Sequence, residues 1–333
     1  MSHFVVFVIG EDVDAQLEPY WELDLSFEEA KDDPRSVFED NTEEVEEGWK
    51  SKIIERVLGP GEENHSPYDY DIRKKAFPNH DPFNMPHRVT AEDLPEGYRL
   101  ESFKAEQLYE SKKAYAKDYH GYNEFDGRFG YFVNPNAKWD WFSIGGRWSN
   151  WLKIKPGAKS VLGEPGVFGR QSKAPGFSDQ ARICDIDFEY HRNEAKKSAE
   201  KYFDNIESVL SGYPDTKTWE ECRELHSDIE AARAFYHNQA AIPLLKQFDR
   251  NFLAGCSVQD YKMGRDAYVA KMISNAGMPY AVVCDGEWYG QGEMGWFGIS
   301  LGDKDTHTWH EEVMAILNAQ DPTTLLTVVD CHI

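Results

Sequence analysis

The segment best suited to chemistry lies between residues 139 and 148, where tryptophan, glycine and arginine occur together. It reads Trp139-Asp-Trp-Phe-Ser-Ile-Gly-Gly-Arg-Trp148. Indole rings offer flat faces to a nucleobase or a sugar, and the guanidinium of Arg147 offers a planar fork to a phosphate or a carboxylate. The glycine pair permits a tight turn or the close approach of a ligand to the backbone. We therefore predict ligand-binding roles for Trp139, Trp141, Gly145, Gly146, Arg147 and Trp148.

Asp140 lies inside this segment, and two interpretations of it are open. In the first, Asp140 performs acid–base catalysis on a bound ligand. In the second, the segment is a strand, a turn and a strand whose tryptophans fill the core, and Asp140 pairs with Arg147.

A glycine-rich segment at residues 285–298 is the second candidate. Five glycines among these 14 residues indicate a loop that faces a ligand. We predict Glu293 as a general base or as a partner of Arg147, with Trp288 and Trp296 as ligand-binding residues. The glycine spacing does not match a dinucleotide or phosphate-loop motif. The alternative is a glycine-bent hairpin that contains a packed tryptophan pair.

The third candidate is Asp330-Cys331-His332. Successive residues of a strand point to opposite faces, so Cys331 cannot pair with His332, whereas Asp330 and His332 share a face. We predict acid–base roles for Asp330 and His332, which His3 joins if the two terminal strands are neighbours. The alternative is an inert buried cysteine beside a satisfied histidine.

Neither a metal nor a cofactor is predicted. His307 and His310 lie three residues apart on an expected helix, but no third ligand is near them in sequence, and two solvent-facing histidines are the simpler interpretation. The five cysteines are widely spaced, without a CxxC pair, which is typical of reduced thiols rather than of a zinc site or a disulfide framework.

The strands and helices that we expect around these residues indicate an α+β fold. Apolar β-branched runs predict strands at residues 3–9, 128–133, 280–284 and 325–333. Helical periodicity predicts helices at 102–119 and 307–318 and a helical block at 190–275. We expect a single domain over 1–333, with a mixed or antiparallel central sheet that includes both terminal strands. An acidic, proline-punctuated and mostly irregular insertion is expected at 22–98.

The charge distribution limits the kind of partner. The net charge is −23, from 36 basic and 59 acidic residues, and the first 50 residues hold 16 acids against three bases. Such a charge opposes direct binding to nucleic acids and to anionic membranes. The acidic residues form either a surface that keeps the protein in solution or a surface that binds a basic host protein. No apolar run approaches the length that spans a bilayer, so we expect a cytoplasmic protein.

Three motifs together resemble those of an uncharacterised family of tailed-phage and bacterial hypothetical proteins. They are WDWxxxGGRW at 139–148, GEMGWxG at 292–298 and TVVDCHI at 327–333. The resemblance implies a phage accessory protein that acts in the host bacterial cytoplasm, and it implies no activity.

Two function hypotheses follow. In one, the protein interferes with a host or defence process by binding a protein partner through its acidic insertion, or a nucleotide-like ligand between the segments 139–148 and 287–296. In the other, it is an enzyme that acts on a nucleotide-derived small molecule by acid–base catalysis.

Overall fold

The computed structural model describes residues 2–81, 83–158, 176–246, 256–274, 276–294 and 300–333. The chain divides into two compact units. Met1–Trp21 and Lys138–Ile333 form the first, here called the sheet unit, and Glu22–Ala137 form the second, here called the inserted unit. No helix in the described part of the chain is long and apolar enough to cross a membrane.

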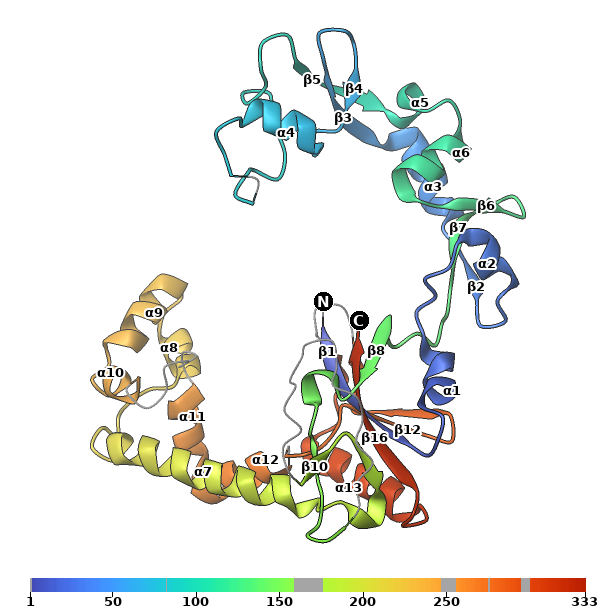
Figure 1. Ribbon diagram of the computed structural model, residues 1–333. Helices are drawn as coiled ribbons and strands as arrows, with labels where there is room; N and C mark the ends of the chain where they lie inside the picture. The colour runs from blue at the N-terminus through green and yellow to red at the C-terminus, as the bar shows by residue number, and fades with distance from the viewer. Residues whose placement is uncertain (1, 82, 159–175, 247–255, 275, 295–299) are drawn as a thin grey trace. The chain divides into compact units, whose positions relative to one another are not determined.

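A six-stranded mixed sheet organises the sheet unit and confirms the predicted α+β class. β1 and β16 pair antiparallel at its centre, and Figure 1 shows them side by side in blue and red. β12 pairs parallel with the other edge of β1, and β13 follows it. β8 and β11 both pair with the remaining edge of β16, at different places along it. The strands are β1 (His3–Ile9), β8 (Trp141–Ile144), β11 (Gln180–Arg182), β12 (Ala281–Cys284), β13 (Glu287–Gly290) and β16 (Leu325–His332).

β1 is apolar on both faces because both faces of the sheet are covered. On one face, Phe7 packs in a cluster with Trp309 and Val313 of α13 (Thr306–Asn318). On the other face, Val6 packs in a cluster with Leu17 of α1 (Val13–Leu17). A strand buried on both sides reads as a continuous apolar run, which is why the sequence identifies it.

The helical block follows the prediction for 190–275 but contains more breaks. The capping box of Thr218 and Glu221 starts a helix as expected, yet that helix ends at Leu225 and Asp228 caps the next one. Gly264, at φ +90°, separates the last two helices. The helices are α7 (Glu189–Leu210), α8 (Trp219–Leu225), α9 (Ile229–Asn238), α10 (Ala241–Leu245), α11 (Cys256–Met263) and α12 (Arg265–Ser274).

Short elements complete the sheet unit. They are η1 (Glu18–Tyr20), η3 (Gly146–Trp148), β9 (Leu152–Lys153), β10 (Phe177–Ser178), η4 (Ile183–Asp185), β14 (Glu293–Met294) and β15 (Ser300–Leu301).

The inserted unit is more regular than the irregular insertion predicted at 22–98. It extends to Ala137 because β2 pairs with β7, and its fully buried Val45 contributes to a small core of its own. Two three-stranded sheets form it, in the orders β2-β7-β6 and β4-β3-β5. Its strands are β2 (Val37–Asp40), β3 (Ile53–Leu58), β4 (Asn64–His65), β5 (Arg99–Lys104), β6 (Asn123–Phe125) and β7 (Arg128–Val133). Its helices are α2 (Phe27–Asp32), α3 (Thr42–Ser51), α4 (Tyr70–Ala76), α5 (Ala105–Leu108), α6 (Lys112–Tyr115) and η2 (Ala116–His120).

Removal of Leu325–Ile333 tests the central position of β16. The deletion leaves the paired edges of β1, β8 and β11 without a neighbour, and exposed apolar strand edges aggregate. We expect no soluble protein, measured by fractionation of the lysate and gel filtration. A soluble truncated chain with a cooperative melting curve would show that β16 is peripheral.

Candidate functional site

The centre of the candidate site is the carboxylate of Asp330 on β16, which is 0% exposed. Its Oδ1 accepts a hydrogen bond from Nδ1 of His3 at 2.8 Å. Its Oδ2 accepts one from the backbone N–H of Arg147 at 2.8 Å. A charge removed from water requires such partners, because its desolvation is costly. Asp330 thereby ties β1 and β16 to the turn that follows β8.

A second histidine–carboxylate pair lies beside the first. Nδ1 of His332 is 2.7 Å from Oδ1 of Asp140 and 2.9 Å from its Oδ2. The His332 side chain is 6% exposed and the Asp140 side chain 38%, so this pair connects the interior to the surface. His3 and His332 are directly opposite in the pairing of β1 with β16, and their ring centroids are 4.8 Å apart.

Trp141 completes the row of rings across three strands. It lies opposite His332 in the pairing of β8 with β16. The two rings stack with centroids 4.9 Å apart and planes 17° apart. Trp141 also meets His3 edge to face at 5.2 Å. We refer to the five residues His3, Asp140, Trp141, Asp330 and His332 as the histidine cluster.

The geometry of the histidine cluster suits proton transfer. When the Nδ1–H of a neutral imidazole donates to a carboxylate, the lone pair is fixed on Nε2, which can then act as a base. Both His3 and His332 meet a carboxylate through Nδ1. Two imidazoles oriented in this way can supply one base and one acid.

Cys331 is separated from this chemistry, as the alternation along the strand predicts. It belongs to the core cluster on the opposite face of the sheet and is 0% exposed. Burial raises the pKa of its thiol well above the ordinary value, and the charges of Asp330 and Asp140 raise it further. A thiol in this state is a poor nucleophile.

Two buried carboxylates pack so closely against the turn at residues 145 and 146 that only glycine fits at these positions. Gly145 and Gly146 have φ values of +72° and +50°, which favour glycine. A Cβ on Gly145 would lie 2.7 Å from Cγ of Asp179, and a Cβ on Gly146 would overlap the side chain of Asp330. Asp179 also accepts a hydrogen bond from Ser149 Oγ at 3.1 Å. The glycines therefore let both carboxylates reach the backbone of the turn.

The structure brings together four of the predicted site residues, and the backbone of the glycine turn adjoins them. The four are Asp140, Trp141, Asp330 and His332. Asp140 accepts from His332 rather than forming the ion pair with Arg147 that the alternative interpretation proposed. Arg147 contacts Asp330 through its backbone, and its residue is exposed.

The other predicted site residues lie elsewhere. Trp139 is 7% exposed in the core of the opposite face, where its Nε1–H donates to the carbonyl of Leu17. Trp288 packs in the same core beside Phe4. Trp148 packs against the core cluster that contains Phe7.

The predicted second segment is only partly described. Glu293 is exposed on β14, which pairs with β15 and not with the central sheet. Trp296 lies outside the described residues.

Two residues near the site carry no clear signal in the sequence. Ser143 is opposite Asp330 in the pairing of β8 with β16, and its buried Oγ has no hydrogen-bond partner among the described residues. Asp179 follows a glycine- and proline-rich segment, and its proximity to Gly145 depends on tertiary structure.

The histidines of α13 are paired individually. His310 Nε2 lies 2.6 Å from Nη1 of Arg192, and burial, followed by the charge of Arg192, lowers the pKa of His310. Nδ1 of His307 lies 3.6 Å from Glu311. Among the residues that the structure describes, no group of three or more His, Cys, Asp or Glu side chains is arranged to hold a metal ion.

Substitution Gly146→Ala tests the role of the glycine turn. The new Cβ meets Asp330, so overpacking of about 1–3 kcal/mol adds to the cost of about 1–2 kcal/mol for a left-handed backbone. The control Gly286→Ala has φ +77° but nothing within 4 Å of the new Cβ, so only the backbone cost applies. Urea unfolding should therefore show a larger loss of stability for Gly146→Ala. Equal losses in the two variants would contradict the packing of Asp330 against this turn.

Comparison of the chain with protein-family models, with curated protein sequences and with solved structures finds no match.

Proposed function

We propose that the protein is an enzyme that cleaves a phosphoester bond of a nucleotide-derived small molecule by acid–base catalysis at the histidine cluster. The supporting observation is the pair of neighbouring imidazoles, each joined through Nδ1 to a carboxylate, with ring centroids 4.8 Å apart. Hydrolysis of a phosphoester requires a base to activate the attacking oxygen and an acid to protonate the leaving oxygen. Two oriented histidines satisfy both requirements.

In the proposed reaction, Nε2 of His332 accepts a proton from a water molecule as the water oxygen bonds to phosphorus. The bond between phosphorus and the leaving oxygen breaks, and His3 in its protonated form donates a proton to that oxygen. Asp140 and Asp330 orient the two rings and balance the charge that develops on them. Proton exchange with water then returns both histidines to their initial states.

Two other residues of the segment 139–148 provide the contacts that bind the substrate. Trp141 offers an aromatic surface for a nucleobase beside His332. Arg147 extends from the turn that Asp330 holds, where a guanidinium suits a phosphate. These contacts are the reason for proposing a nucleotide-derived substrate.

His332→Gln and Asp140→Asn test the acid–base proposal. We expect the wild-type protein to cleave a member of a panel of nucleotides and cyclic nucleotides, and His332→Gln to lower kcat by about 100-fold or more. Asp140→Asn should also lower kcat, because the ring of His332 loses its orienting carboxylate. The control His307→Gln alters a surface histidine that pairs with Glu311, and it should leave kcat unchanged. Wild-type kcat in a folded His332→Gln variant, or no turnover of any panel member by the wild type, would refute the proposal.

Arg147 provides a second arm of the same experiment. Arg147 is exposed, and Arg147→Ala retains the backbone N–H that donates to Asp330, so the free energy of unfolding should change by less than about 1 kcal/mol. KM should rise about tenfold, and Arg147→Lys should not restore it, because lysine lacks the planar fork. A large loss of stability in Arg147→Ala would instead assign the side chain a structural role.

A second candidate function is the binding of a basic host protein by the inserted unit, in the phage setting that the sequence resemblance implies. The supporting observation is an excess of exposed acidic residues over exposed basic residues in α2, β2 and α3. The exposed bases of these elements are Lys31 and Lys50. The exposed acids are Glu28, Glu29, Asp32, Glu39, Asp40, Glu43, Glu44 and Glu47.

Charge neutralisation on the inserted unit tests this second function. The triple variant of Glu28, Glu43 and Glu47 to Gln should lose a host protein that the wild type captures from bacterial lysate at low salt, because electrostatic attraction drives the encounter. The control changes Glu200, Glu220 and Glu224 of the helical block to Gln, so the net charge is altered equally. Capture of the same host protein by both variants, identified by mass spectrometry, would exclude the acidic surface as its binding site.

A further inference from the structure

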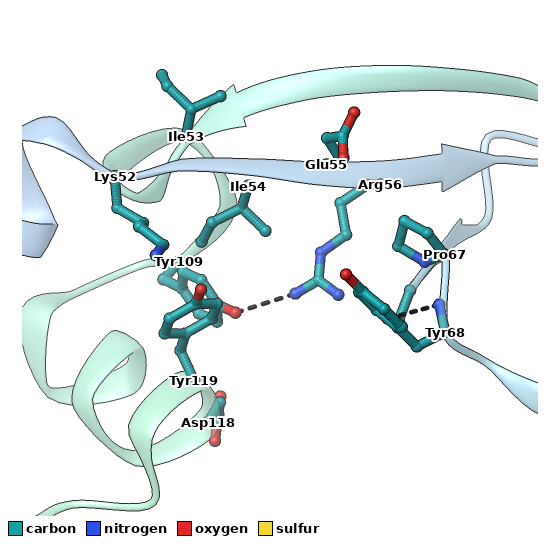
Figure 2. A pocket seen from close by; sticks show the side chains of 11 residues that line it. Lys52, Ile53, Ile54, Glu55, Arg56, Pro67, Tyr68, Tyr109, Asp118 and Tyr119 are labelled. Carbon is teal, nitrogen blue, oxygen red and sulfur yellow. Dashed lines mark hydrogen bonds between the residues drawn. The ribbon is translucent and has the colours of Figure 1, made fainter. Parts of the chain in front are cut away.

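A pocket of about 420 Å³ lies within the inserted unit, independently of the histidine cluster. Strand β3 forms one wall of this pocket. The other walls are formed by residues 66–68 after β4, by Tyr109 after α5, and by Asp118 and Tyr119 of η2. Figure 2 shows the lining side chains. The volume falls in the range of pockets that bind small ligands, about 300–1,000 Å³.

Arg56 gives the pocket a positive centre. Figure 2 shows its side chain reaching from β3 toward Tyr109, and its Nη2 donates to the Tyr109 hydroxyl at 3.0 Å. The Arg56 Nε atom is buried and has no acceptor among the described residues. A partly desolvated guanidinium whose hydrogen bonds are incompletely satisfied is stabilised by a nearby anion.

Tyrosine rings give the pocket aromatic surfaces. Tyr68, Tyr109 and Tyr119 all line it, and Tyr68 is 52% exposed, so its ring is accessible to a ligand. Nζ of Lys52 lies 5.7 Å from the centroid of the Tyr119 ring and adds a second positive charge. Rings and cations therefore occur together in one hollow.

Two carboxylates also line the pocket, and they reduce but do not cancel its attraction for anions. Glu55 forms an ion pair with Arg88, with Oε2 2.8 Å from Nη2, so its charge is already balanced. Asp118 is the other carboxylate. Lys52 and Arg56 balance the two carboxylates of the lining, and Arg88, which pairs with Glu55 from outside the lining, leaves the site with one net positive charge.

We propose that this pocket binds a small molecule in which an aromatic ring carries a phosphate group. The phosphate lies against Arg56 and Lys52, where a guanidinium supplies a planar pair of donors. The ring of the ligand packs against the half-exposed ring of Tyr68. Neither a bare phosphate nor an uncharged ring uses both halves of the pocket.

Isothermal titration of the full-length protein with phenyl phosphate tests this site, with inorganic phosphate and phenol as the two partial probes. We expect phenyl phosphate to bind at least about tenfold more tightly than either partial probe, because it alone uses both halves of the pocket. Arg56→Gln should weaken phenyl phosphate binding about tenfold or more, and Tyr68→Ala should weaken it several-fold. Tyr68 is half exposed, so Tyr68→Ala keeps the test valid even if Arg56→Gln does not fold.

A matched control tests whether binding depends on Arg56 in particular. Arg99→Gln removes an exposed arginine of β5 that pairs with Glu62 and Glu101, and it should leave binding unchanged. Binding that survives Arg56→Gln and Tyr68→Ala in folded protein would overturn the assignment, as would an absence of phenyl phosphate binding at millimolar concentration.

Discussion

The buried carboxylate of Asp330 is the interaction on which the site depends. Its two oxygens are committed to two different parts of the chain, His3 on β1 and the backbone of Arg147 after β8. Removal of one partner of a buried charge typically costs about 3–5 kcal/mol, which is a large fraction of the stability of a domain. The register of the terminal strands, the sharp glycine turn and the orientation of His3 are therefore linked through one side chain.

The sheet supplies the rigidity that the histidine cluster requires. His3, His332 and Trp141 stand in one row across three paired strands, so their separations follow from the spacing of strands rather than from loop conformation. The same face of the sheet continues into the apolar cluster that contains Phe7 and Trp309. The histidine cluster is thus the polar end of a sheet face whose remaining part packs in the hydrophobic core.

The sequence is most informative where a single residue pattern decides the structure. Continuous apolar runs identify β1 and β16, and the alternation along a strand places Asp330 and His332 on one face with Cys331 on the other. The capping box at Thr218 likewise marks its helix locally. The pairing of His332 with Asp140 depends on the register between β8 and β16, which no local pattern encodes. The structure of the inserted unit is difficult to predict from the sequence for a related reason. Its strands are short and rich in charge, and they are recognised as strands only through their pairing within the unit.

The pairing of β1 with β16 also has a consequence for biosynthesis. His3 and Asp330 are 327 positions apart, so the central pair of the sheet joins segments that the ribosome produces at very different times. Such non-local contacts slow folding, since the entropy of closing the intervening chain must be overcome first. The inserted unit is one continuous stretch, Glu22–Ala137, so the segments that contact one another within it are all synthesised well before β16. During that interval the apolar residues of β1 are exposed, and this strand is where we expect a chaperone to bind the nascent chain.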